Sequence, residues 1–195
     1  MRLFVALEIP AAVRDNLATF IKGMSEISEQ SERSWVRWVR PENLHVTLRF
    51  IGEVADADLD GIRAALSTVR AEAPLEIRFR GLGFFPDEDS PTVLWTGLDA
   101  TPNLPSLAGA IDGVLANQGI RRENRAFLPH MTLARFAPPG IQKKLRGVIK
   151  QNEEREFGSF QTREFHLIES KLKPTGAEYT SLASFPLTLE TQGDG

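Results

Sequence analysis

The stretch AFLPHMTLARF, residues 126–136, contains a four-letter pattern, His-x-Thr-Leu, that also occurs in NLHVTLRF at residues 43–50. The chain has three histidines among its 195 residues, and two of them, His45 and His130, begin this pattern. Short patterns recur by chance, so the sequence around each copy has to decide what the repetition means. The pattern predicts a structural unit that occurs twice, with one histidine in each copy.

Each copy has the alternation of a β-strand, in which successive side chains point to opposite faces. In the first copy one face carries His45, Thr47 and Arg49, and apolar residues occupy the other. In the second copy His130 and Thr132 share a face. The apolar faces require a helix-covered core, so both polar faces are expected to point outward into one shared cleft.

The segments around the two copies follow a matching order. Strands are expected at 2–9, 44–52, 75–83, 92–98, 130–136, 160–169 and 179–189, where apolar and β-branched residues predominate. Apolar residues at helical spacing predict helices at about 11–30, 59–69, 102–118 and 139–152, the second of them capped by Asp56 or Asp58. The order strand, helix, His-x-Thr strand, helix, strand thus occurs twice.

This internal duplication predicts the fold class. We expect an α+β protein of two lobes related by an approximate two-fold axis. Residues 1–190 are expected to form this single two-lobed domain. The last residues, TQGDG at 191–195, have the composition of a frayed tail.

The composition excludes several classes of protein. A net charge of −3 with 42% hydrophobic and 25% charged residues is typical of a soluble globular protein, and no apolar run approaches the ~18 residues that a membrane span needs. The chain has no cysteine, which excludes disulfides and thiolate metal ligands and suits a cytoplasmic location. Arginines nevertheless cluster around both copies of the pattern, which favours local phosphate-binding flanks: Arg33, Arg37, Arg40 and Arg49, then Arg121, Arg122, Arg125 and Arg135.

Two imidazoles in one cleft suit paired general acid–base chemistry, because a histidine of ordinary pKa near ~6.5 can hold a proton while its twin lacks one. Threonine hydroxyls can donate hydrogen bonds to a phosphate oxygen as negative charge develops there. No HExxH-like spacing and no carboxylate cluster lies nearby, so no metal is expected. Metal-free hydrolysis of a phosphodiester fits these groups, and a strained cyclic phosphate fits best.

Other side chains have simpler structural interpretations. His166 has no threonine two positions later and is expected to be structural. Trp35, Trp38 and Phe127 are expected to pack in the core or at its rim rather than to stack on bases. Phe127, just before the second pattern, is kept as a candidate substrate contact, as is Arg49 in the first.

The chain resembles the two-histidine phosphoesterase superfamily, and within it the LigT-like RNA 2′,3′-cyclic phosphodiesterases, once described as 2′-5′ RNA ligases. The resemblance runs almost end to end, through MRLFVALEIP, WVRPENLHVTLRFIGEV, FLPHMTLARF and ESKLKPTGAEYTSLASFPL. It implies two pseudo-symmetric α/β lobes whose antiparallel sheets flank a central cleft, in agreement with the duplicated pattern.

The resemblance also implies roles for individual residues. His45 would be the proton donor to the leaving 3′ oxygen and His130 the proton acceptor that activates water, with Thr47 and Thr132 holding the phosphate. Arg135 matches a recurrent family arginine, although simple alternation places it on the apolar face of its strand. Its entry into the cleft therefore requires a twist or the end of the strand. No cofactor is implied.

The expected reaction is hydrolysis of an RNA 3′-terminal 2′,3′-cyclic phosphate to a 2′-phosphate, by a monomer whose partner is an RNA 3′ end or a cyclic nucleotide. Three alternatives are a ligase that joins RNA through a 2′-5′ bond, a phosphodiesterase for small cyclic nucleotides, and a non-catalytic nucleotide-binding module. Both histidines and both threonines are present, which argues against the binding module, because a binder needs no matched acid and base.

Overall fold

The computed structural model describes residues 1–29, 36–71, 73–141, 143–174 and 176–188. The strands are β1 (Arg2–Glu8), β2 (Val36–Trp38), β3 (His45–Glu53), β4 (Leu75–Phe85), β5 (Val93–Thr101), β6 (His130–Phe136), β7 (Glu156–Thr162), β8 (Glu164–Lys173) and β9 (Gly176–Pro186). The helices are α1 (Ala11–Glu29), α2 (Leu59–Leu66), α3 (Leu104–Ala116) and α4 (Lys143–Gln151). The expected tail at 191–195 lies outside the described residues.

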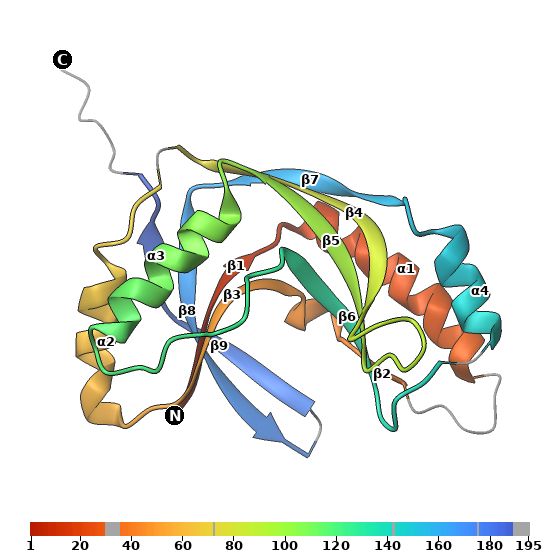
Figure 1. Cartoon of the computed structure of the whole chain (residues 1–195), viewed down its shortest axis with the longest axis horizontal. Helices are drawn as coiled ribbons and strands as arrows, with labels where there is room; N and C mark the ends of the chain where they lie inside the picture. The colour runs from red at the N-terminus through yellow and green to blue at the C-terminus, as the bar shows by residue number, and fades with distance from the viewer. Residues whose placement is uncertain (30–35, 72, 142, 175, 189–195) are drawn as a thin grey trace.

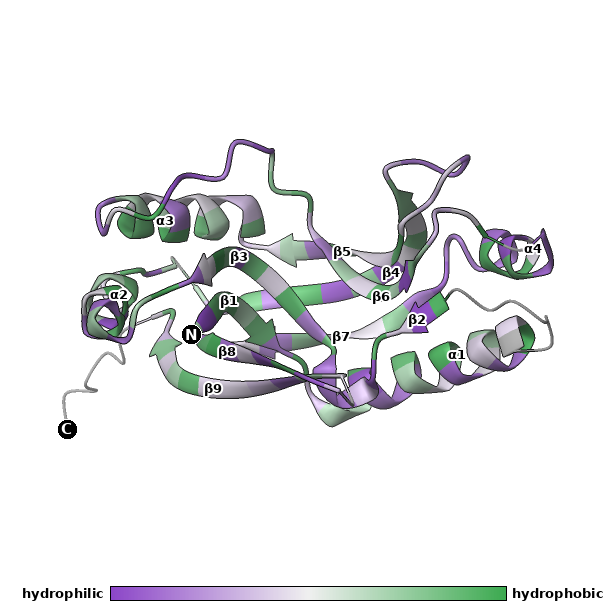
Figure 2. Cartoon of the chain, turned by 90° about the horizontal axis from the view of Figure 1, so that it is seen from below, coloured by the Kyte–Doolittle hydropathy of each residue, from purple (hydrophilic) through white to green (hydrophobic). Residues whose placement is uncertain are grey.

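The strands form two antiparallel sheets (Figure 1). Sheet A has the strand order β3-β1-β8-β9, and sheet B has the order β2-β6-β5-β4-β7. In sheet A, α3 packs on β3 and α2 packs on α3, whereas α1 packs on β7 and β2 of sheet B and α4 packs on α1. Figures 1 and 2 place α2 and α3 on one flank of the molecule and α1 and α4 on the other. The α+β class, with two antiparallel sheets, is confirmed.

Four strands follow an equivalent order in the two sheets, but neither lobe is a contiguous half of the chain. The order β3-β1-β8-β9 is matched by β6-β5-β4-β7, so that each His-x-Thr strand lies beside the first strand of its own half. The third strand is exchanged: β4, from the first half, pairs with β5, and β8, from the second half, pairs with β1. The helices cross over as well, because α1 follows β1 yet covers sheet B. The two halves are therefore interlocked.

The hydrophobic core lies between each sheet and its helices. It joins one face of β1 and β3, and one face of β5 and β6, to the buried sides of all the helices named above. Phe4, Ala6 and Ile168 form a small separate buried cluster on the opposite face of sheet A. We call this opposite face, in each sheet, the inner face. It is the face that the helices leave uncovered.

The expected strand over 160–169 is wrong, because this segment contains the junction of two strands. The strand before the bend at Arg163 is β7, which forms an edge of sheet B. The strand after the bend is β8, which belongs to sheet A. The carbonyl oxygen of Arg163 accepts a hydrogen bond from the backbone N–H of Leu187 at 2.7 Å, so the polar backbone at the bend is satisfied. Alternation of side chains continues across such a junction and does not reveal a change of sheet.

The starts of two helices also differ from the expectation, one in its capping and the other in its position. Asp58 occupies the N-cap position of α2 but forms no side-chain capping bond, because residues Asp56–Asp58 already form a 3₁₀ turn and its backbone is helical. Helix α4 begins at Lys143, not at residue 139. Among the described residues, no helix is long and apolar enough to cross a membrane.

Candidate active site

The two His-x-Thr strands, β3 and β6, lie next to each other although they belong to different sheets. β3 is the edge strand of sheet A, and β2 pairs with β6 only from Ala134 to Phe136. Among the described residues, the first part of β6, which carries the histidine, therefore has no strand paired on that side. The sequence repeat thus brings both copies together where the sheets meet.

A β-bulge in β6 decides where Arg135 points. Thr132 pairs with Trp95 and Arg135 pairs with Val93, so Leu133 is an extra residue relative to β5. Directly opposed residues share a face of an antiparallel sheet, and a bulge shifts the alternation of the strand by one residue. Arg135 is accordingly exposed on the inner face with His130 and Thr132. The face expected from simple alternation is wrong here. A bulge, rather than a twist or the end of the strand, brings Arg135 to the inner face.

A bulge in β3 has the opposite effect on Arg49. Thr47 pairs with Ala6 and Arg49 pairs with Val5, so Leu48 is the extra residue and Arg49 turns to the face that α3 covers. There its Nε donates to the Asp112 carboxylate at 2.7 Å, with both side chains largely buried. The prediction that Arg49 shares a face with His45 and Thr47 is therefore wrong. Its guanidinium, which also donates to backbone carbonyl oxygens of Phe50 and Arg121, is engaged in holding the loop after α3.

Both catalytic candidates are held by the same backbone contact. Nδ1 of His45 lies 2.7 Å from the carbonyl oxygen of Asn43, and Nδ1 of His130 lies 2.7 Å from the carbonyl oxygen of Leu128. A carbonyl only accepts, so Nδ1 carries the proton in each ring. Nε2 is then left to take a proton when the ring is neutral or to give one when it is charged. The pseudo-symmetry thus extends to the tautomer of each imidazole.

Aromatic rings fix the orientation of both imidazoles. The His45 ring lies 4.8 Å from the ring of Phe4 and 5.2 Å from that of Tyr179, which it meets edge-on. The His130 ring lies 4.9 Å from Phe85 and 6.4 Å from Trp95. Each histidine is therefore held between two rings, one set in each sheet.

A glycine makes room for the indole beside His130. A Cβ atom at Gly83 would lie 2.2 Å from Cζ2 of Trp95, which is closer than any side chain can approach. Gly83 lies directly opposite Trp95 in the β4–β5 ladder. A residue with a side chain at this position would displace Trp95 and remove its support for the His130 ring.

Burial changes the protonation of two groups at the site. Burial lowers the pKa of His45 below its ordinary value, while the contact with the Asn43 carbonyl acts in the opposite direction. Burial raises the pKa of the Tyr179 phenol, and the charges of Arg135 and Arg2 oppose that rise. Tyr179 belongs to sheet A and Arg135 to sheet B, so the charge of Arg135 acts on the phenol from the other sheet. The phenol stays protonated at neutral pH and can donate a hydrogen bond.

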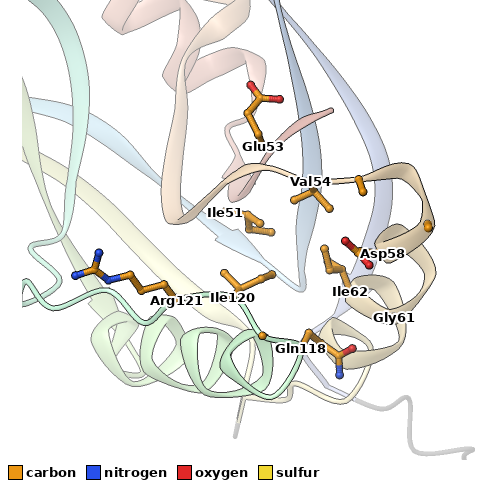
Figure 3. Close-up of a pocket in the computed structure, with 12 residues that line it drawn as sticks. Ile51, Glu53, Val54, Asp58, Gly61, Ile62, Gln118, Ile120 and Arg121 are labelled. Carbon is orange, nitrogen blue, oxygen red and sulfur yellow. The ribbon is translucent and has the colours of Figure 1, made fainter.

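A pocket of about 170 Å³ opens beside His45, and its lining includes Glu8, Tyr179 and Ser181. A second hollow, of about 480 Å³, lies between the end of β3, helix α2 and the loop after α3 (Figure 3). The second hollow contains no residue of either His-x-Thr pattern. We therefore place the candidate site at the inner faces beside His45 and His130.

Phe127 and His166 both pack against other parts of the protein. Phe127 is partly buried and packs against the hydrophobic core. His166 is buried, its Nδ1 is 3.3 Å from the Ser181 hydroxyl oxygen, and a Glu8 carboxylate oxygen lies 3.9 Å away. These contacts agree with a structural role for His166. In the part of the chain that the structure describes, no three acidic or histidine side chains are grouped to hold a metal ion.

Sequence reasoning missed several residues of the site. Tyr179, Phe4, Phe85 and Trp95 surround the histidines, and Arg37 lies opposite Arg135 in the β2–β6 ladder. The only signal for Trp95 was its alternation in TVLWTGL, and that pattern does not tell which face is buried. Tyr179 lies far along the chain from His45, and no local pattern connects them. Arg37 was noted within a basic cluster, whereas its partner across the ladder was not foreseeable.

Comparison with known proteins agrees with this geometry. The sequence profile of the LigT-like phosphoesterases matches residues 7–95 and 98–179. A protein of Archaeoglobus fulgidus named RNA 2′,3′-cyclic phosphodiesterase is 34% identical over 185 residues, which covers 95% of this chain and 99% of the relative. A relative of the same name from Methanocaldococcus jannaschii is 32% identical over 179 residues, covering 92% of this chain and 96% of the relative.

Solved structures show the same architecture. The Thermus thermophilus protein TT0787 superimposes with a TM-score of 0.77 at 31% identity, over 96% of this chain and 98% of that one. Escherichia coli LigT in complex with 3′-AMP superimposes with a TM-score of 0.75 at 26% identity, over the same shares of the two chains. The match of fold and sequence extends over both lobes and both histidine strands, and the chain belongs to the LigT-like phosphoesterase family.

Proposed function

We propose that the protein is an RNA 2′,3′-cyclic phosphodiesterase that opens the 3′-terminal cyclic phosphate to a 2′-phosphate. One observation carries the proposal: two imidazoles with the same fixed tautomer, on adjacent strands, each with Nε2 left for a substrate. A non-catalytic binder needs no such matched pair. The names of the relatives support the same reaction, and the 3′-AMP complex of Escherichia coli LigT supports a nucleotide as the ligand.

The proposed reaction uses both histidines at once. His130 takes a proton from water, the water oxygen forms a bond to phosphorus, and the bond from phosphorus to the 3′ oxygen breaks. His45 gives its proton to that 3′ oxygen, so charge and atoms balance. Within the described residues neither Thr47 nor Thr132 forms a side-chain hydrogen bond, so both hydroxyls can donate to the phosphate as it gains charge. Arg135 adds a positive charge on the same face.

The proposal requires no metal ion or cofactor, because the two imidazoles supply the acid and the base. It also takes residues 1–190 as one functional unit, because each lobe contributes half of the site. We further propose that this unit acts as a monomer in the cytoplasm, where a chain without cysteine is suited to reducing conditions.

The product tests the assignment of acid and base. With a 2′,3′-cyclic nucleotide and an excess of EDTA, we expect turnover to a 2′-phosphate, because the 3′ oxygen faces the donor His45. Phosphorus NMR distinguishes the two phosphate positions directly. A 3′-phosphate as the main product would reverse the roles of His45 and His130, and a rate that collapses with EDTA and returns with zinc or magnesium would refute metal-free chemistry.

The pKa of His45 gives a prediction on pH dependence. In the free protein burial lowers this pKa, so a smaller fraction of His45 is charged at neutral pH. A bound phosphate anion favours the imidazolium and raises the pKa. The profile of kcat/KM reports the free protein and that of kcat reports the complex. We therefore expect both profiles to be bell-shaped, with the optimum of kcat at a higher pH than the optimum of kcat/KM.

Proton NMR measures the same effect without turnover. His45 is one of three histidines, so His130→Gln and His166→Gln variants assign its resonance. We expect His45 to titrate below the ordinary value of ~6.5 in the free protein and at higher pH when inorganic phosphate is added. A free-protein pKa above the ordinary value, or no response to phosphate, would contradict the prediction.

A further inference from the structure

Two arginines lie directly opposite each other on neighbouring strands at the edge of sheet B. Arg37 of β2 pairs with Arg135 of β6, and both are exposed. Directly opposed side chains on one face are about 5 Å apart at their Cβ atoms, and like charges at such positions destabilise a sheet. The fold therefore keeps two positive charges together at an energetic cost.

Among the described residues, neither charge is compensated by a carboxylate. In the part of the chain that the structure describes, the side chains of Arg37 and Arg135 form no ion pair and no hydrogen bond. Other arginines behave differently, since Arg49, Arg80 and Arg125 each contact a carboxylate. Within the described structure, the pair on β2 and β6 is thus a positive site without an acidic partner, in a protein with a net charge of −3.

Arg37 and Arg135 lie on the same face as His130 and Thr132, farther along the sheet. The bulge at Leu133 places Arg135 on the inner face with Thr132, and Arg37 shares that face because it pairs with Arg135. On β5 the partners of Thr132 and Arg135 are two residues apart, so the pair lies about 7 Å beyond Thr132 along the strand. Two guanidiniums at this distance can reach a phosphate next to the reacting one.

We propose that Arg37 binds the phosphate on the 5′ side of the terminal nucleotide, while Arg135 lies nearer to the reacting cyclic phosphate. This inference rests on the proposed function and names its substrate class: an RNA strand of at least two nucleotides is favoured over a cyclic mononucleotide, which lacks that phosphate bridge. Contacts to phosphate position a nucleic acid without reading its sequence. Arg37 therefore acts on every base sequence alike.

The test compares two substrates in the same protein. Wild-type protein and Arg37→Ala are assayed with a dinucleotide that ends in a 2′,3′-cyclic phosphate and with the matching cyclic mononucleotide. We expect the ratio of the two kcat/KM values, dinucleotide over mononucleotide, to fall by about tenfold in Arg37→Ala, as for the loss of one hydrogen bond to a charged group. For the dinucleotide, the dependence of log KM on log salt should be weaker in Arg37→Ala than in the wild-type protein, because one screened charge contact is lost.

Lys150→Ala is the matched control, because it removes one exposed positive charge from helix α4 on the far side of sheet B. We expect it to leave the substrate ratio unchanged. An unchanged ratio in Arg37→Ala, whether activity is retained or lost equally on both substrates, would overturn the inference. A wild-type protein that turns over neither substrate would instead refute the proposed function, and the inference with it.

Discussion

Replacing either His45 or His130 by alanine is expected to lower kcat for a 2′,3′-cyclic phosphate by about 10²–10⁴-fold, the usual contribution of a general acid or base. Each ring has its Nδ1 proton committed to a backbone carbonyl, so Nε2 is the atom that exchanges a proton with the substrate. Single-turnover rates of the purified variants, with circular dichroism to verify folding, measure the effect. The double variant should lose little more than the worse single variant, because the two residues act as a unit.

His166→Ala is the control for this prediction. His166 is the remaining histidine of the chain and lies on the inner face of the same sheet, where it pairs with Ala6. Its Nδ1 lies near Ser181 and Glu8, and its Nε2 lies 3.7 Å from a Glu164 carboxylate oxygen. We expect a loss in kcat below about tenfold, because His166 is assigned no proton transfer in the reaction. A folded His45→Ala or His130→Ala variant with near wild-type turnover would remove the proposed roles.

Replacing Thr47 or Thr132 by valine should lower kcat by about 10²–10³-fold, the effect of removing one donor to a developing oxyanion. Valine keeps the shape of the side chain and deletes the hydroxyl. Both hydroxyls lack an internal partner in the described structure, so their hydrogen bonds are expected to form with the substrate. The loss should appear in kcat more than in KM, because the charge on the phosphate oxygens grows in the transition state.

Thr47→Ser and Thr132→Ser are the matched variants, since serine retains the hydroxyl. Each is expected to recover most of the activity that the valine variant loses. Equal losses for the serine and valine variants would show that the threonine methyl group, and so packing, causes the effect. Unfolding by urea separates the two explanations, because a packing role changes the denaturation midpoint and a catalytic role does not.

The local pattern of the sequence was sufficient for most elements. The strand positions around His45 and His130 and the helix pattern of α1 follow from periods of two and 3.6 residues, which neighbouring residues alone determine. The α+β class followed from the order of these elements, which occurs twice. The two catalytic candidates followed from the repeat itself, and the family resemblance supplied their distinct roles as donor and acceptor.

The local pattern did not predict which face each side chain occupies after Thr47 in the first strand and after Thr132 in the second. The segments LHVTLRF and HMTLARF both look like regular strands, yet Leu48 and Leu133 are bulged residues. A bulge exists only relative to the partner strand, so it depends on the pairing with β1 or β5. One bulge removed Arg49 from the inner face, and the other brought Arg135 onto it.

The sequence by itself therefore determined that a strand–helix unit occurs twice, that each copy carries a histidine and a threonine on one face, and that the chemistry does not depend on cysteine. Only the tertiary structure decided that β4 and β8 are exchanged between the halves, that Tyr179 contacts His45, and that Arg37 lies opposite Arg135. The physical reason is the range of the interactions. Backbone periodicity acts over a few residues, whereas strand pairing is selected by burial of the whole core, which joins residues far apart in the chain.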